Sequence, residues 1–202
     1  GRVGRRADLG GGRHRVGVGA RRRDPRAGYP LPMRRLALLV PLVLPGWWLS
    51  RAGRTAIGHR SGDMVSHVWA IWNGARAWPG DPTFSALVGW PDGTDLLVFY
   101  GGWGHTLVGV AASLLLGVGP AVAYSIALCT WLVVAGFGGH ALARSLGAGT
   151  LGAVAAGLVL QLDGIVLYHA TDGRPEHAGV GVAALALAGA VTAWRGEGGA
   201  WR

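Results

Sequence analysis

Long uncharged stretches alternate with short polar segments along most of the chain. The longest runs from Ala121 to Ala143 and carries no formal charge over 23 residues when His140 is counted as neutral. At about 1.5 Å of rise per residue, a helix of this length reaches roughly 34 Å, which is enough to cross the hydrocarbon core of a bilayer. The pattern therefore predicts a membrane protein built from transmembrane helices.

Further apolar segments stand on both sides of this run. We expect spans at residues 36–50, 121–143, 149–163 and 178–194, and a short helix at 105–116. The first span follows Arg34 and Arg35 and ends near Trp47 and Trp48, an arrangement typical of a signal-anchor helix with its basic end in the cytoplasm. A signal peptide is the alternative for this segment, because its apolar region has a similar length.

The number of spans depends on the short helix. If residues 105–116 do not cross the membrane, Arg144 and Arg195 fall on the same side as Arg34 and Arg35, in agreement with the positive-inside bias. If they do cross, the loop at 172–177 moves to the cytoplasmic side. We favour four spans and one short helix.

The segment 51–104 is too long to be a mere connection between two neighbouring helices. Within it Val65, Val68, Trp69 and Trp72 recur at helical spacing, which predicts an amphipathic helix with these residues on one face. We expect Ser66, His67 and Asn73 to point elsewhere, and the helix to end at the turn 79–82. The predicted fold class is all-α: a polytopic transmembrane helical bundle whose extracytoplasmic loop carries an amphipathic interfacial helix.

Small residues are frequent in the predicted helices. They predict close backbone approach, since lipid provides no hydrophobic drive for helix association. The glycines concerned are Gly136, Gly138, Gly139, Gly149, Gly152, Gly157, Gly179 and Gly181. The only cysteine, Cys129, lies within a span and is interpreted as a small packing residue.

The net charge of +9 is concentrated in the first 32 residues, which hold nine Arg and two Asp. This Arg- and Gly-rich segment has too few apolar residues to fold, so we interpret residues 1–32 as a disordered tail or as untranslated sequence upstream of Met33. Residues 33–202 form the membrane domain. Because most of the net positive charge belongs to this tail, with only +2 left for residues 33–202, we do not expect nucleic acid as a partner.

The order of polar segments resembles a known group of enzymes. After the first span come DMVSHVWAIWNGARAW, WPDGTDLLVFYGGWGHTL, a Gly-rich short helix, a long span, and later DGRPEHAGVGVAALAL. Over residues 33–195 this spacing is similar to the N-terminal part of the GT-C superfamily, polytopic glycosyltransferases that use lipid-linked sugar donors. Members of that superfamily are usually several hundred residues long, so we expect this chain to be an N-terminal fragment.

The resemblance implies transfer of a sugar from a polyprenyl phosphate at the extracytoplasmic face of a bacterial inner membrane. Asp63 matches the acidic residue early in the first loop, which in the family acts as catalytic base or helps to hold a divalent cation such as Mg²⁺ or Mn²⁺. Many members carry a second acid beside the first, whereas Met64 stands there in this chain. Membrane lipid and the donor are the expected partners.

Four further residues are candidate substrate contacts. His105 precedes an apolar stretch at a place where related enzymes often carry a histidine, and Arg174, Glu176 and His177 are ionisable residues immediately before a span. Arg174 suits a bidentate phosphate contact. Each residue also has a local interpretation: Asp63 as a helix N-cap, His105 as an interfacial histidine, and the others as a solvated loop. The alternative function is a non-catalytic polytopic protein, either a transporter fragment or a scaffold.

Overall fold

The computed structural model describes residues 38–52, 55–58, 62–88, 92–96 and 103–196, and these are predominantly helical, as the sequence predicts. The helices are α2 (Val40–Ala52), α3 (Gly62–Ala77), α4 (Trp103–Leu116), α5 (Pro120–Ser145), α6 (Thr150–Gln161), α7 (Gly164–Thr171), the 3₁₀ helix η2 (Pro175–Gly179) and α8 (Val180–Trp194). Two short strands, β1 (Phe84–Ser85) and β2 (Thr94–Asp95), pair antiparallel with Phe84 opposite Asp95. The segment 1–32, including its predicted disorder, lies outside the described residues.

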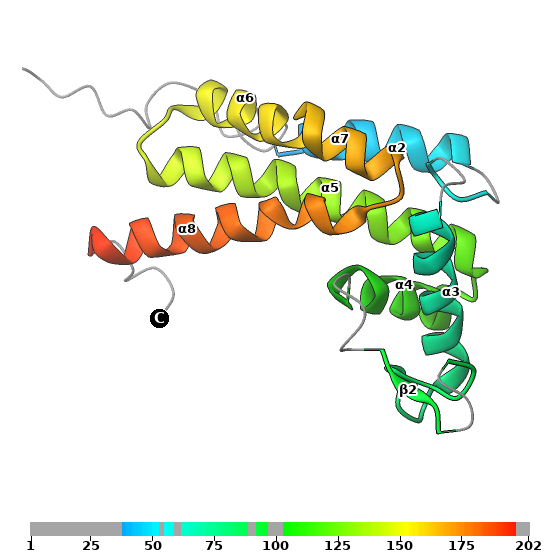
Figure 1. The fold of residues 1–202 in the computed structure, drawn as a ribbon. Helices are drawn as coiled ribbons and strands as arrows, with labels where there is room; N and C mark the ends of the chain where they lie inside the picture. Colours follow the sequence, from blue (N-terminus) through cyan, green and yellow to red (C-terminus); the bar gives the residue numbers. More distant parts are fainter. Residues whose placement is uncertain (1–37, 53–54, 59–61, 89–91, 97–102, 197–202) are drawn as a thin grey trace, which may run out of the picture.

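The long helix α5 forms the centre of the fold and contacts α2, α3, α4, α6 and α8 (Figure 1). Helix α2 runs antiparallel to it, because Pro41 lies beside Gly136 whereas Pro45 lies beside Cys129. Helix α6 is also antiparallel to α5, and α8 is parallel to it. Helix α3 crosses the bundle near the N-terminal end of α5 and leads to the small β-hairpin (Figure 1).

By length and hydropathy, α5 is the one described helix that could cross a membrane by itself. Helices α6 and α7 would give a second span if the two, bent by 40° at their junction, are counted together. Helices α4 and α8 are apolar but shorter. The expected all-α class is thus found in the described residues, whereas the number of spans stays a prediction.

Glycines bring the main chains of three helices together, as the sequence predicts. A Cβ atom on Gly157 in α6 would lie 2.5 Å from the carbonyl oxygen of Gly136 in α5, and one on Gly139 would lie 2.8 Å from that of Ala156. In α8, Gly181 lies directly against the main chain of Ala135. The prediction does not extend to every glycine, because a Cβ atom on Gly149 or Gly179 would meet nothing within 4 Å.

A buried glutamine compensates for a proline inside α2. Pro45 has no N–H group, so the carbonyl of Pro41, four residues earlier, loses its helical partner. The side chain of Gln161 in α6 replaces it, with Nε2 donating to Pro41 O at 2.7 Å and to Leu132 O at 3.2 Å. Gln161 is completely buried, so this polar contact fixes how α2, α5 and α6 pack.

The segment 164–177, between two predicted spans, is largely helical. Helix α7 occupies Gly164–Thr171, and Asp163 caps its N-terminus by accepting hydrogen bonds from the backbone N–H groups of Ile165 and Val166 at 2.9 and 3.4 Å. An aspartate immediately before an apolar run is a strong helix-start signal. The predicted span at 178–194 is also preceded by η2, and α8 begins at Val180.

The side of α3 that packs on the other helices is not the predicted apolar stripe. Its buried side consists of Met64, His67, Ala70, Ile71, Asn73 and Gly74. Val65 is 57% exposed, and the two predicted tryptophans of this face are only half-buried. Ile71, on this packed side, lies directly against Gly109 of α4, where a Cβ atom would collide with the Ile71 side chain.

Candidate functional site

An ion pair joins two of the residues that the sequence singles out. The Nε atom of Arg174 lies 2.6 Å from Oδ2 of Asp63 and donates a hydrogen bond to it, although the residues are 111 positions apart. The Arg174 Nε atom also lies 3.7 Å from Oδ2 of Asp172. Arg174 and Asp63 are 46% and 50% exposed, so the pair is open to a ligand from solvent or from a membrane surface.

The local backbone explains why these side chains meet. Asp63 is the second residue of α3, not the residue before the helix, and a carboxylate in the first turn is favoured by the helix dipole. Gly173 has φ of +86°, and a Cβ atom there would lie 2.7 Å from the backbone nitrogen of Met64. Only glycine therefore allows the turn 172–174 to pack this closely on the start of α3.

Two histidine rings stack beside the ion pair. His169, near the end of α7, and His177, in η2, have ring centroids 3.7 Å apart and planes inclined by 15°. The ring of Tyr168 meets that of His169 edge-on at 5.2 Å. His177 was predicted from the sequence as a candidate substrate contact, whereas His169 was not. The backbone of Glu176 belongs to η2, and its side chain lies outside the described part of the structure.

His105 does not join the surface pair. It is only 2% exposed, and its ring lies 5.5 Å from that of His67 and 5.0 Å from that of Tyr124. These three side chains come from α3, α4 and α5 and form a buried aromatic cluster where the helices cross. This burial separates His105 from the surface ion pair, and its contact with a donor phosphate stays a prediction.

The divalent cation implied by the resemblance finds no ligand set in the described residues. Among them, no three His, Cys, Asp or Glu side chains converge in a way that could hold a metal ion. Met64, which follows Asp63, carries a thioether and therefore does not supply a second carboxylate. The divalent cation stays a prediction.

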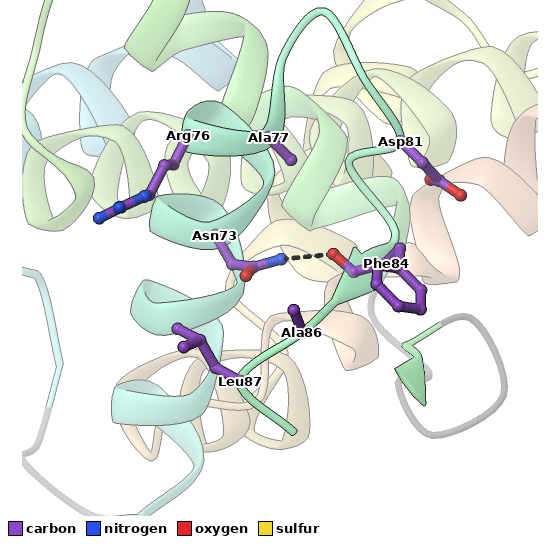
Figure 2. A pocket seen from close by; sticks show the side chains of 7 residues that line it. All are labelled: Asn73, Arg76, Ala77, Asp81, Phe84, Ala86 and Leu87. Carbon is purple, nitrogen blue, oxygen red and sulfur yellow. Dashed lines mark hydrogen bonds between the residues drawn. The ribbon is translucent and has the colours of Figure 1, made fainter. Parts of the chain in front are cut away.

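A cavity of about 570 Å³ lies at the other end of α3 and is lined by Asn73, Arg76, Ala77, Asp81, Phe84, Ala86 and Leu87 (Figure 2). The amide Nδ2 of Asn73 donates to the carbonyl of Phe84 at 3.2 Å and ties β1 to α3. The Arg76 and Asp81 side chains point to opposite sides (Figure 2). Hydrogen bonds from the side chain and backbone of Thr83 lower the pKa of Asp81. Asn73 is ten residues from Asp63, or about 15 Å along the helix, so this cavity is separate from the ion pair.

Comparison with known protein families, with curated proteins and with solved structures finds no match for this chain.

Proposed function

We propose that the protein transfers a sugar from a polyprenyl phosphate donor to an acceptor hydroxyl at the extracytoplasmic face of a bacterial inner membrane. Asp63 is the general base, and Arg174 holds the donor phosphate. The observation that carries this proposal is the half-exposed contact between the Asp63 carboxylate and the Arg174 guanidinium. It brings a proton acceptor and a phosphate-binding cation together at one end of an apolar helical bundle.

The reaction needs both groups. The Asp63 carboxylate takes the proton of the acceptor hydroxyl, while the oxygen of that hydroxyl forms a bond to the anomeric carbon of the sugar. The bond between that carbon and the phosphate oxygen breaks, and the polyprenyl phosphate leaves with the bonding electrons. Negative charge builds up on the departing phosphate, and Arg174 stabilises it. A guanidinium offers five N–H donors, so it can contact Asp63 and a phosphate at once.

The arrangement of arginines supports the proposed orientation in the membrane. Arg144 near the end of α5 and Arg195 after the end of α8 lie together, because the Arg195 guanidinium donates to the carbonyl of Ser145. Helix α2, preceded in the sequence by Arg34 and Arg35, begins toward the same end. The positive-inside bias assigns this end to the cytoplasm.

The candidate site belongs to the opposite half of the bundle. Ile57, whose backbone N–H donates to the Ser125 hydroxyl at 2.9 Å, and Gly58, which touches the end of α7, mark this level near the start of α5. Helix α5 has 26 residues and is about 39 Å long, so its two ends reach both surfaces of a bilayer. In the four-span topology that we propose, α4 packs beside the first half of α5 without crossing the bilayer.

The second candidate is a non-catalytic polytopic protein in which the ion pair only attaches α3 to the turn before α8. The close contact between Gly173 and Met64 favours this possibility, because it joins the same two segments without any chemistry. The two functions differ in what loss of Arg174 should do: a structural tie affects stability, whereas a phosphate contact affects donor affinity.

Arg174→Ala tests the proposal through the donor KM. A hydrogen bond to a charged group contributes about 1.5–3 kcal/mol, so we expect KM for a polyprenyl phosphate sugar to rise by about 10- to 150-fold. The measurement is the initial rate of sugar transfer by the whole protein in proteoliposomes at varied donor concentration. Arg76→Ala is the matched control, because Arg76 is also exposed but lies at the far end of α3. Equal donor KM values for both variants and the wild type would show that Arg174 does not contribute to donor binding.

A further inference from the structure

The turn that carries Arg174 is closed by the two stacked histidines. The backbone N–H of Arg174 donates to the carbonyl of His169 at 2.8 Å, and the backbone N–H of His177 donates to the carbonyl of Arg174 at 3.5 Å. The rings of His169 and His177, 3.7 Å apart, join the two ends of the same segment. Arg174 thus lies between the two residues whose side chains stack.

This closure is needed because the neighbouring elements are short. Helix α7 has eight residues and η2 has five, and helices of this length are marginal without tertiary support. The Arg174 side chain is long and half-exposed, so its free conformational entropy opposes a fixed contact with Asp63. Buried Pro175 and the contact between Gly173 and Met64 fix one side of the turn. The histidine stack fixes the other side.

We propose that His169 and His177 are positioning residues: their stacked rings hold the turn 170–176 closed and thereby keep Arg174 against Asp63. Neither ring is assigned a contact with the reacting atoms. The catalytic consequence rests on the proposed function, whereas the geometric claim does not. The stack acts through shape and dispersion, so another planar ring should replace imidazole.

Cross-linking measures the geometry without any activity. In a Cys129→Ala background of the whole protein, Asp63→Cys and Arg174→Cys are combined, and the rate of disulfide formation under mild oxidation is followed. We expect His177→Ala and His177→Leu to slow cross-linking by about three- to tenfold, and His177→Phe to stay within about twofold of the parent. The Ala, Leu and Phe variants at His169 should show the same order of cross-linking rates as those at His177. His177→Leu keeps the side-chain bulk, so it separates loss of stacking from loss of volume.

Equal rates in the Ala, Leu and Phe variants would overturn the positioning role, and so would a Phe variant as slow as the Ala variant. Kinetics on the protein with Asp63 and Arg174 intact give a second readout: His177→Ala should raise the donor KM far more than it lowers kcat, and His177→Phe should restore KM. Slower cross-linking in His177→Ala and recovery in His177→Phe, without sugar transfer by any form, would keep the positioning role and reject the glycosyltransferase proposal.

Discussion

Asp63→Asn is expected to lower kcat for sugar transfer by about 10²- to 10⁴-fold, the range by which a positioned general base accelerates a reaction. Asparagine has nearly the same shape and can still accept a hydrogen bond from Arg174, but it cannot take the proton of the acceptor hydroxyl. The measurement is single-turnover transfer from a labelled polyprenyl phosphate sugar at saturating donor. Single turnover separates the chemical step from product release.

The matched control for this substitution is Asp92→Asn. Asp92 is exposed and belongs to the turn before β2, where Gly93 has φ of +78°, so it is an acid of the same loop with a local structural role. We expect the Asp92→Asn variant to transfer sugar at the same single-turnover rate as the wild type. If Asp63→Asn turned over as fast as Asp92→Asn, Asp63 would not be the base, and the ion pair would have only a structural role.

Gly181→Leu is expected to have the largest effect on stability. A side chain at this position would run into the main chain of Ala135 and Val134 in α5, and main-chain atoms cannot move aside as a flexible side chain can. Helix α8 would have to separate from α5, at a cost above the usual 1–3 kcal/mol of overpacking and thus about 3 kcal/mol or more. We therefore expect little folded protein after extraction, and a strongly lowered melting temperature for what remains.

Gly189→Leu is the control on the same helix. Nothing lies within 4 Å of a Cβ atom at Gly189, so the added side chain points into open space and should leave the melting temperature nearly unchanged. Comparison of the two leucine variants cancels the change in hydrophobicity and helix propensity. Equal melting temperatures for the two would contradict the close packing of α8 on α5.

The helices could be predicted from the sequence because their apolar runs are long and clearly bounded. The predicted segment 121–143 lies inside α5, and 105–116 differs from α4 only by two residues at its start. Helix α7 was missed because Asp163-Gly164 and Gly173-Arg174-Pro175 are typical of loops. The eight residues Gly164–Thr171 between them are mostly apolar, and Asp163 as their N-cap was the available signal.

The inner face of α3 could not be predicted, because periodicity identifies an apolar stripe but not the surface that covers it. His67 is buried because His105 and Tyr124, from two other helices, provide ring contacts. Such contacts join residues far apart in the sequence. For the same reason, local hydropathy could not place Gln161, whose partner Pro41 is 120 positions away.

The candidate site was only partly accessible from the sequence. Asp63 and Arg174 were predicted as site residues on separate grounds. Asp63 was predicted from its place after the first span, and Arg174 as a phosphate-binding cation before the last span. Their contact depends on the left-handed Gly173, which lies two residues after the end of α7 and packs on Met64 at the start of α3. His169 gave no signal by itself, because its proposed role depends on stacking against His177, eight positions later in the sequence.

The central claim is that the Asp63–Arg174 pair lies at the outer face of the membrane, and cysteine labelling tests it most directly. In a Cys129→Ala background, exposed Thr171 beside the site and exposed Leu146 after α5 are changed singly to cysteine in the whole protein. Intact bacterial cells are treated with a membrane-impermeant maleimide. We predict labelling of Thr171→Cys in intact cells and of Leu146→Cys only after permeabilisation. Labelling of Leu146→Cys in intact cells, and of Thr171→Cys only after permeabilisation, would contradict the placement of the ion pair at the outer face.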